Sequence, residues 1–358
     1  MSQPKASRLA PIDALRGAAI LFMIFDHCID WWLAAPYRDL LLDRLSGFIG
    51  TLAAPIFVTL VGVGLVLSIE RRRARGIPPR AVVAGLVGRG LQIIAVGYLM
   101  NLAVFFVGSN PADIFAVDVL HLIGLGLVIG IPVAWAVPAV PALLLGALWA
   151  VLSALYGGSF TLPAAPGAWV NGESGIGYFP ALPWLAYVWI GVGVGRLLWR
   201  RMARRSGDPG PLAGPLLLAA LICFALMLVV PNVGFRHPRL GHISLSLAVV
   251  FGLWALLDAL NRAGGLAQRG VIAPLALLGE VSLMLYVFHH LIGYRMLSLF
   301  GVVTGRAWRG EYGTLTPAAA LAGVALMAVL CLLVAGPWKR VRGPLEAALL
   351  GGLRRASP

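Results

Sequence analysis

The chain has 358 residues, of which 60% are hydrophobic and 12% are charged, with a mean hydropathy of +0.90. This composition excludes an ordinary soluble enzyme and is typical of a protein that crosses a membrane several times. The net charge of +14 would suit a nucleic-acid partner, but the basic residues stand in short clusters between apolar stretches, as in 70–75 (ERRRAR) and 200–205 (RRMARR). We interpret them as the positive-inside signal of membrane topology and expect no nucleic-acid partner.

Apolar stretches of about twenty residues, the length that crosses a bilayer as a helix, recur along the whole chain. An even number of spans with the amino terminus inside places both termini and every strongly basic loop in the cytoplasm. The sequence therefore predicts an all-α bundle of about ten transmembrane helices. It forms one domain over 1–358 in the cell (inner) membrane, with cytoplasmic tails at 1–11 and 339–358. The expected spans are 13–34, 48–69, 83–107, 116–135, 140–157, 179–199, 212–231, 242–261, 274–297 and 317–338.

The fourth and fifth of these spans are the hardest pair to separate. They are joined by the uncharged stretch 137–141 (VPAVP), which could be a tight turn between two helices or a kink in one long element. The three cysteines, Cys28, Cys223 and Cys331, have no CxxC spacing, so we expect no disulfide framework and no zinc site.

The first span is unusual because it is apolar enough to cross a bilayer and yet carries several ionisable residues. Such a residue in hydrocarbon costs at least a few kcal/mol, so a polar interior and a function are expected. The eleven residues from Arg16 to His27 turn a helix about 20° beyond three full turns and raise it by about 16 Å. Both side chains should therefore share one face at two depths, with i, i+3 neighbours at either end. The ionisable residues of 12–32 (IDALRGAAILFMIFDHCIDWW) are Asp13, Arg16, Asp26, His27 and Asp30.

With this topology, all six histidines fall in the outer half of the membrane or in outer loops. Asp118 and His121 are i, i+3 partners, as are Tyr286 and His289, so each pair can face the centre of the bundle. The grouping predicts a polar cavity, and it leaves open whether His289 or His290 faces it. The histidines are His27, His121, His237, His242, His289 and His290, and Asp113, Arg236 and Arg239 accompany them.

A second group of cations lies toward the cytoplasmic side. Snorkelling to the interface accounts for Arg196. Arg16 and Arg89, if they face the bundle, could bind phosphates through bidentate hydrogen bonds. Cations inside and histidines outside, about 16 Å apart, would suit an extended donor with an anionic head at the cytoplasm.

At these residues the sequence resembles known families. The spacing from Arg16 to His27, with ten residues between them, resembles the transmembrane acyltransferases of acyltransferase family 3. Other stretches resemble the branch that holds the bacterial DUF1624 proteins and the heparan-alpha-glucosaminide N-acetyltransferases. These stretches are 12–27, 51–68 (TLAAPIFVTLVGVGLVLS), 118–130 (DVLHLIGLGLVIG), 177–196 (GYFPALPWLAYVWIGVGVGR) and 278–290 (LGEVSLMLYVFHH).

The resemblance implies an acyltransferase that moves an acyl group, as acetyl, from cytoplasmic acyl-CoA to a sugar or glycoconjugate on the outer side. It makes His27 the catalytic histidine and Arg16 a contact of the donor phosphates. Acetyl-CoA is then a co-substrate, no metal or haem is expected, and the partners are membrane lipid and a possible second copy of the chain.

The residues themselves suggest the remaining roles. An imidazole suits general-base chemistry near neutral pH, and direct transfer and an acyl-histidine intermediate both stay open. The same buried groups could serve a proton-coupled transporter or permease. Histidines on facing helices could also hold a haem.

For the acyltransferase, the residues are assigned to three roles. The expected catalytic residues are His27, Asp30 and Asp26; those for acyl-CoA are Arg16, Arg89 and Asp13; those for the acceptor or oxyanion are His121, Asp118, Tyr286, His289 and His290.

Overall fold

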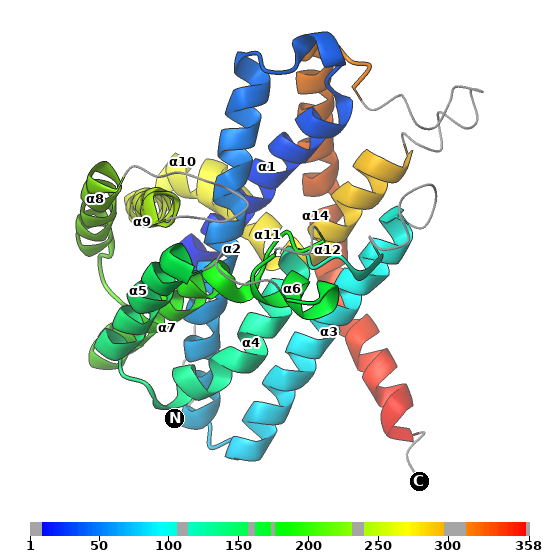
Figure 1. Cartoon of the computed structure of the whole chain (residues 1–358). Coiled ribbons are helices and arrows are strands. Elements are labelled where there is room, and N and C mark those ends of the chain that lie inside the picture. The colour runs from blue at the N-terminus through cyan, green and yellow to red at the C-terminus, as the bar shows by residue number, and fades with distance from the viewer. Residues whose placement is uncertain are drawn as a thin grey trace. The chain divides into compact units, whose positions relative to one another are not determined.

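The computed structural model describes residues 9–105, 114–156, 162–172, 176–230, 240–296 and 313–355, and most of them are helical (Figure 1). The sequence-predicted residues Asp113, Arg236, His237 and Arg239 lie outside this part of the chain. Within it, seven helices are long and apolar enough to cross a membrane, and a bent pair of helices would make an eighth span. The prediction of an all-helical multi-pass membrane protein is confirmed at this level.

The chain divides into two compact units, and we describe each by itself. Among the described residues, one unit comprises those of 9–50 and 260–355, and the other comprises those of 51–259. We call them the histidine unit and the arginine unit, after the clusters described below. The histidine unit contains α1 (Ala10–Trp32), η1 (Ala35–Tyr37), the start of α2 (Leu41–Ala74), α10 (Gly265–Ala267), η3 (Gln268–Ile272), α11 (Ala273–Glu280), α12 (Ser282–His290), η4 (Leu291–Met296) and α14 (Pro317–Arg355).

The backbones of α1 and α11 touch where the two helices cross. A Cβ atom at Gly17 would overlap the carbonyl oxygen of Leu275, and one at Gly279 would overlap the carbonyl oxygen of Asp13. Small residues at a crossing allow close packing of helices in a membrane, where the hydrophobic effect contributes little to helix association. Glycine is therefore required on both sides of this contact, which fixes how α1 and α11 are aligned.

The ninth predicted span, 274–297, is a bent element rather than the single helix that the sequence suggested. Helix α11 ends at Glu280 and α12 begins at Ser282, with a bend of 78° between the helix that includes α11 and the one that includes α12. Val281, at the junction, has φ −114° and ψ 18°, outside the helical range. The bend directly follows the crossing at Gly279, and the carboxylate of Glu280 at the bend pairs with Lys339 of α14 at 2.8 Å.

The carboxyl end of α1 is joined to the segment before α14 by backbone hydrogen bonds. The Ala34 N–H donates to the Leu315 carbonyl at 3.0 Å, and the Leu315 N–H donates to the Trp32 carbonyl at 2.9 Å. From its start at Pro317, α14 runs past Pro337 and Pro344 and continues through the predicted tail as far as Arg355.

The arginine unit contains α3 (Pro79–Phe105) and the helices that follow it up to α9. Helix α4 ends at Ala136 and α5 begins at Ala139, so the stretch VPAVP joins two helices and does not kink one. Leu144 and Leu148 of α5, with Leu217 and Leu221 of α8, are more than half exposed, as expected for side chains that face lipid. The helices after α3 are α4 (Val119–Ala136), α5 (Ala139–Tyr156), α6 (Ala164–Val170), α7 (Ala181–Arg204), α8 (Ala213–Val229) and α9 (Leu240–Ala263).

An arginine of α7 connects three helices of this unit through an ion pair and hydrogen bonds. Arg196 pairs with Glu70 of α2 and donates to two carbonyls of the last turn of α4, those of Ala134 at 2.6 Å and Trp135 at 2.9 Å. Only 14% of its side chain and 13% of that of Glu70 are exposed. Carbonyls at a helix end have no partner within the helix, so Arg196 supplies the hydrogen bonds that α4 would otherwise lack. Snorkelling alone does not describe this residue.

Candidate functional site

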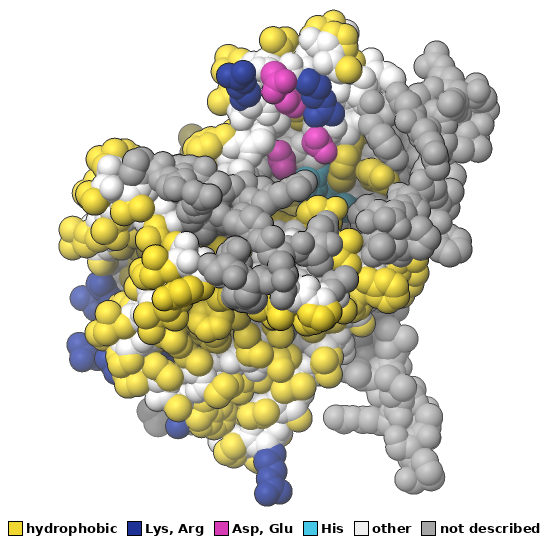
Figure 2. Space-filling model, viewed as in Figure 1, with side chains coloured by type: hydrophobic (Ala, Val, Ile, Leu, Met, Phe, Trp, Pro, Cys, Tyr) yellow, Lys and Arg dark blue, Asp and Glu magenta, His cyan; other side chains and the backbone are white. Residues whose placement is uncertain are grey.

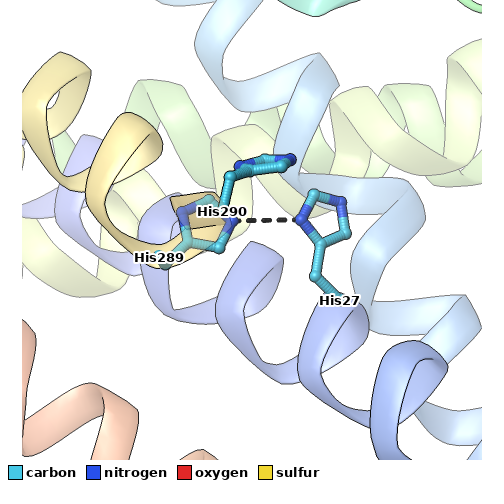
Figure 3. A group of neighbouring side chains, drawn as sticks. All are labelled: His27, His289 and His290. Carbon is cyan, nitrogen blue, oxygen red and sulfur yellow. Dashed lines mark hydrogen bonds between the residues drawn. The ribbon is translucent and has the colours of Figure 1, made fainter. Parts of the chain in front are cut away.

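Three histidines meet in the histidine unit and form a compact cluster. His27 of α1 points toward His289 and His290 at the end of α12 (Figure 3). The Nδ1 atom of His27 lies 3.1 Å from the Nε2 atom of His289. One ring nitrogen from each of the three residues lies within 4.8 Å of the other two. The structure therefore brings together both histidines between which the sequence did not choose.

The end of α12 explains how two adjacent residues reach the same neighbour. After His290 the chain enters the π-helical segment η4. In η4 the carbonyl of Gly293 accepts a hydrogen bond from Trp32 Nε1 at 3.1 Å. A Cβ atom on Gly293 would also press against the ring of Trp31. These contacts hold the end of α12 against α1, close enough for both histidine rings to contact His27.

The hydrogen bonds determine which nitrogen of each ring carries the proton when all three histidines are neutral. His289 Nδ1 lies 2.9 Å from the Leu285 carbonyl, and His290 Nδ1 lies 2.9 Å from the Tyr286 carbonyl. A carbonyl only accepts, so both Nδ1 atoms are donors and both Nε2 atoms carry a lone pair. His27 Nδ1–H then donates to His289 Nε2, which leaves Nε2 of His27 as its basic nitrogen.

Aromatic rings surround the cluster. The ring centroid of Trp31 lies 5.2 Å from that of His27 and 5.4 Å from that of His290. Tyr286 packs against His290 with 4.5 Å between centroids, so this predicted site residue belongs to the cluster. The sequence analysis missed Trp31, although a residue four positions after His27 on a helix shares its face and could have been named for that reason.

The aspartates near His27 have other partners. Arg38 bonds to both the carboxylate and the carbonyl of Asp30, with 3.1 Å to the carboxylate, and lies 3.3 Å from the carboxylate of Asp43. The carboxylate of Asp26 lies against Gly50. In Figure 2, acidic and basic side chains gather at one place on the surface, and histidine is visible beside them. The ring of His27 is thus oriented by His289, and a catalytic role for Asp26 and Asp30 stays a prediction.

The predicted contacts of the donor lie on two helices. Arg16 and Asp13 form an ion pair at 2.8 Å on α1, with 26% of the arginine side chain exposed. This is the i, i+3 pairing that their spacing suggests. Arg89 lies on α3, in the arginine unit. Binding of acyl-CoA by these residues stays a prediction.

Asp118 and His121 interact as their i, i+3 spacing suggests, and together they cap the first turn of α4. Asp118 is the N-cap of α4, and its carboxylate accepts from the Val119 N–H at 2.6 Å. The Asp118 N–H in turn donates to His121 Nδ1 at 3.1 Å, which completes a capping box. His121 is fully buried and packs against the ring of Tyr98. Helix capping accounts for this pair, and a contact with the acceptor stays a prediction.

A multi-pass membrane protein with clustered basic nitrogens on its helices fits the class of membrane group-transfer enzymes, and the comparison with known families identifies the kind. A profile described as heparan-alpha-glucosaminide N-acetyltransferase, catalytic, matches residues 8–225. No individual curated protein matches the chain. The match covers more than half of the sequence, so the chain belongs to the heparan-alpha-glucosaminide N-acetyltransferase family, whose members are membrane N-acetyltransferases. This part of the resemblance is confirmed, and the links to acyltransferase family 3 and DUF1624 stay predictions.

Proposed function

We propose that the protein transfers an acetyl group from acetyl-CoA on the cytoplasmic side to an amine or hydroxyl of a sugar or glycoconjugate on the outer side. The single observation that carries this proposal is the hydrogen bond from His27 Nδ1–H to His289 Nε2, because it leaves a basic nitrogen on the first helix of a family member. The DUF1624 proteins would then belong to the same branch, and acyltransferase family 3 would share the spacing from Arg16 to His27.

In the proposed reaction, Nε2 of His27 removes the proton of the acceptor as its nitrogen or oxygen attacks the thioester carbonyl. The tetrahedral intermediate collapses, the carbon–sulfur bond breaks, and the CoA thiolate takes the proton from Nε2. Throughout, Nδ1–H of His27 keeps its hydrogen bond to His289, which stabilises the imidazolium form. In this step His289 acts as a positioning residue. We propose that His290, whose ring lies beside that of His27, and Tyr286, whose ring packs on His290, contact the acceptor.

The donor is proposed to bind with its phosphates near Arg16. The Asp13 carboxylate holds the guanidinium in place, and a guanidinium can bind a phosphate through two parallel hydrogen bonds. Along α1, the eleven-residue rise of about 16 Å separates this charge from His27, a length that the arm of CoA can span.

This orientation requires the full topology that the sequence predicts. Helix α1 and the shorter apolar helix α8 fall outside the count of seven or eight spans, α1 because of its charged residues and α8 because of its length. We propose that both cross the membrane, which gives ten spans, both termini in the cytoplasm and a location in the cell (inner) membrane. The whole chain, 1–358, then acts as one transmembrane acyltransferase domain.

The test is turnover of acetyl-CoA by purified protein in detergent, with a panel of amino sugars as acceptors. His27→Ala should bind acetyl-CoA and lose about 10²- to 10⁴-fold in turnover, the usual contribution of a general base. Arg16→Ala should lose binding. The matched controls are Cys28→Ala, which changes the neighbouring buried residue, and Arg340→Gln, which removes an exposed arginine of α14 in the same unit. The acetyltransferase proposal fails if the parent protein binds no acyl-CoA.

The bend between α11 and α12 favours a second candidate, a proton-coupled transporter. Broken helices that meet at mid-membrane are a common way to build a substrate site in transporters. Reconstituted protein in liposomes would then move an amino sugar inward when an acid-outside proton gradient is applied, without acetyl-CoA. The family match supports the acetyltransferase, so we rank transport second.

A further inference from the structure

The three-histidine cluster could bind a metal ion as well as supply a general base. His27, His289 and His290 come from two helices that lie far apart in the sequence, and one ring nitrogen of each lies within 4.8 Å of the other two. Imidazole nitrogens are typical ligands for Zn²⁺, Cu²⁺ and Ni²⁺. Three protein ligands with a fourth position left for water or substrate is the arrangement of many zinc sites in enzymes.

The hydrogen bonds of the two α12 histidines fit this donor set. Metal-bound histidines almost always donate their other ring N–H to a carbonyl, carboxylate or water, which fixes the tautomer and the ring plane. His289 and His290 do so to the carbonyls of Leu285 and Tyr286. Both rings therefore already present Nε2, the nitrogen that would bind the ion.

The distances also suit a small cation. Two nitrogens bound to Zn²⁺ at about 2.05 Å in a tetrahedron lie about 3.3 Å apart. The measured separation of His27 Nδ1 and His289 Nε2 is 3.1 Å. The ligand atoms of all three residues lie within 4.8 Å of one another, so closing the site requires a shift of at most about 1.5 Å in one side chain.

An ion can reach the site from the surface. His27 and His290 are partly exposed, and Asp30 nearby is well exposed. Asp30 and Asp43 both bond to the one guanidinium of Arg38, so this group of three side chains carries a net negative charge, which attracts cations.

We propose that one Zn²⁺ ion binds to His27 Nδ1, His289 Nε2 and His290 Nε2, and that it inhibits acetyl transfer. The inhibition rests on the proposed function. The ion takes the place of the proton on His27 Nδ1, and a neutral His27 then carries its proton on Nε2. The number of protons on the protein is unchanged, but Nε2 can no longer accept one from the acceptor. The ion acts as an inhibitor rather than a cofactor of the transfer.

The experiment measures Zn²⁺ binding directly, on full-length protein without a polyhistidine tag, by isothermal titration in detergent. The parent should bind one ion per chain. His290→Ala and His289→Ala should each weaken binding at least tenfold, because one of three ligands is lost. His242→Ala removes a buried histidine of the arginine unit and should bind as the parent does. Co²⁺ provides an independent readout, since its visible absorption reports tetrahedral coordination.

Binding and activity separate the two proposals. If the parent binds Zn²⁺ no more tightly than His27→Ala or His290→Ala, the site does not exist, whatever the enzyme does. If Zn²⁺ binds through these histidines and acetyl transfer continues at saturating Zn²⁺, the proposed inhibition is wrong. If the protein binds Zn²⁺ in this way but turns over no acetyl-CoA, whether Zn²⁺ is present or absent, the metal site stands and the acetyltransferase proposal fails.

Discussion

The histidine unit and the arginine unit both bury ionisable side chains, but these side chains have different kinds of hydrogen-bond partner in the two units. In the arginine unit, Arg196 bonds to Glu70 and to the carbonyls at the end of α4, and His121 accepts from the N-cap of the same helix. In the histidine unit, His27 instead meets another titratable ring, that of His289. Groups that complete helix ends or form an ion pair stabilise a fold, whereas two imidazole rings that contact one another can pass a proton. The identity of the partner, rather than burial alone, distinguishes the two kinds of polar residue.

The strongest test of this comparison removes the partner of His27. His289→Leu takes away the atom that accepts from His27 Nδ1–H, so the ring can adopt the other tautomer and lose its basic Nε2. We expect turnover of acetyl-CoA to fall about a hundredfold, or about 2.7 kcal/mol in activation free energy. Steady-state kinetics on the purified variant measure this.

A conservative variant separates positioning from packing. The amide oxygen of His289→Gln can accept from His27 Nδ1–H, so a substantial part of the lost rate should return. Equal rates for the leucine and glutamine variants would show that His289 acts through its bulk alone and would remove the contrast between the units.

The next test concerns the ion pair of the arginine unit. Glu70→Gln removes the charge that faces Arg196, and breaking a buried pair usually costs 3–5 kcal/mol. Because both side chains keep some exposure, we expect a loss of about 2 kcal/mol, seen as a lower temperature of thermal unfolding, with turnover per folded molecule unchanged. Arg73→Gln, which removes the more exposed partner of Glu70, should cost much less. A loss of turnover without a loss of stability would place Glu70 in the reaction instead.

The smallest expected effect is at the cap of α4. Asp118→Ala removes the side chain that accepts from the first N–H groups of the helix, which costs about 1 kcal/mol. Asp118→Asn keeps a capping oxygen and should retain most of the stability. If the asparagine variant is as stable as the parent and yet cannot use the acceptor, Asp118 contacts the acceptor as the sequence analysis expected.

Much of the fold could be predicted because hydropathy and charge are local signals. The apolar stretches locate the helices, and His27 stands out because a charged or titratable residue in such a stretch is unusual. The bend at Val281 has no such signal, since the break falls at a residue that is neither glycine nor proline. The bend comes two residues after the contact of Gly279 with α1, which joins segments more than 260 positions apart.

The site was predictable in part for the same reason. The i, i+3 spacing paired Arg16 with Asp13, and Asp118 with His121, correctly. The partner of His27 lies 262 positions away, beyond the reach of any spacing argument. His289 and His290 differ by 100° around a regular helix, so the sequence left open which of them faces the cavity and did not indicate that both contact His27. The π-helical segment that follows α12 is the feature that the sequence did not indicate.

The glycine crossing of α1 and α11 fixes the position of His27, because α1 is a continuous helix from that contact onward. The contact at Gly17 prevents α1 from sliding or rotating against α11, and His27 stands ten residues beyond it, about 15 Å along the axis. Inserting or deleting one residue in between would swing His27 about 100° away from His289. Side chains along this segment can change, but its length cannot, so in this family insertions should accumulate in the loops and spare the nine residues between the glycine and the histidine.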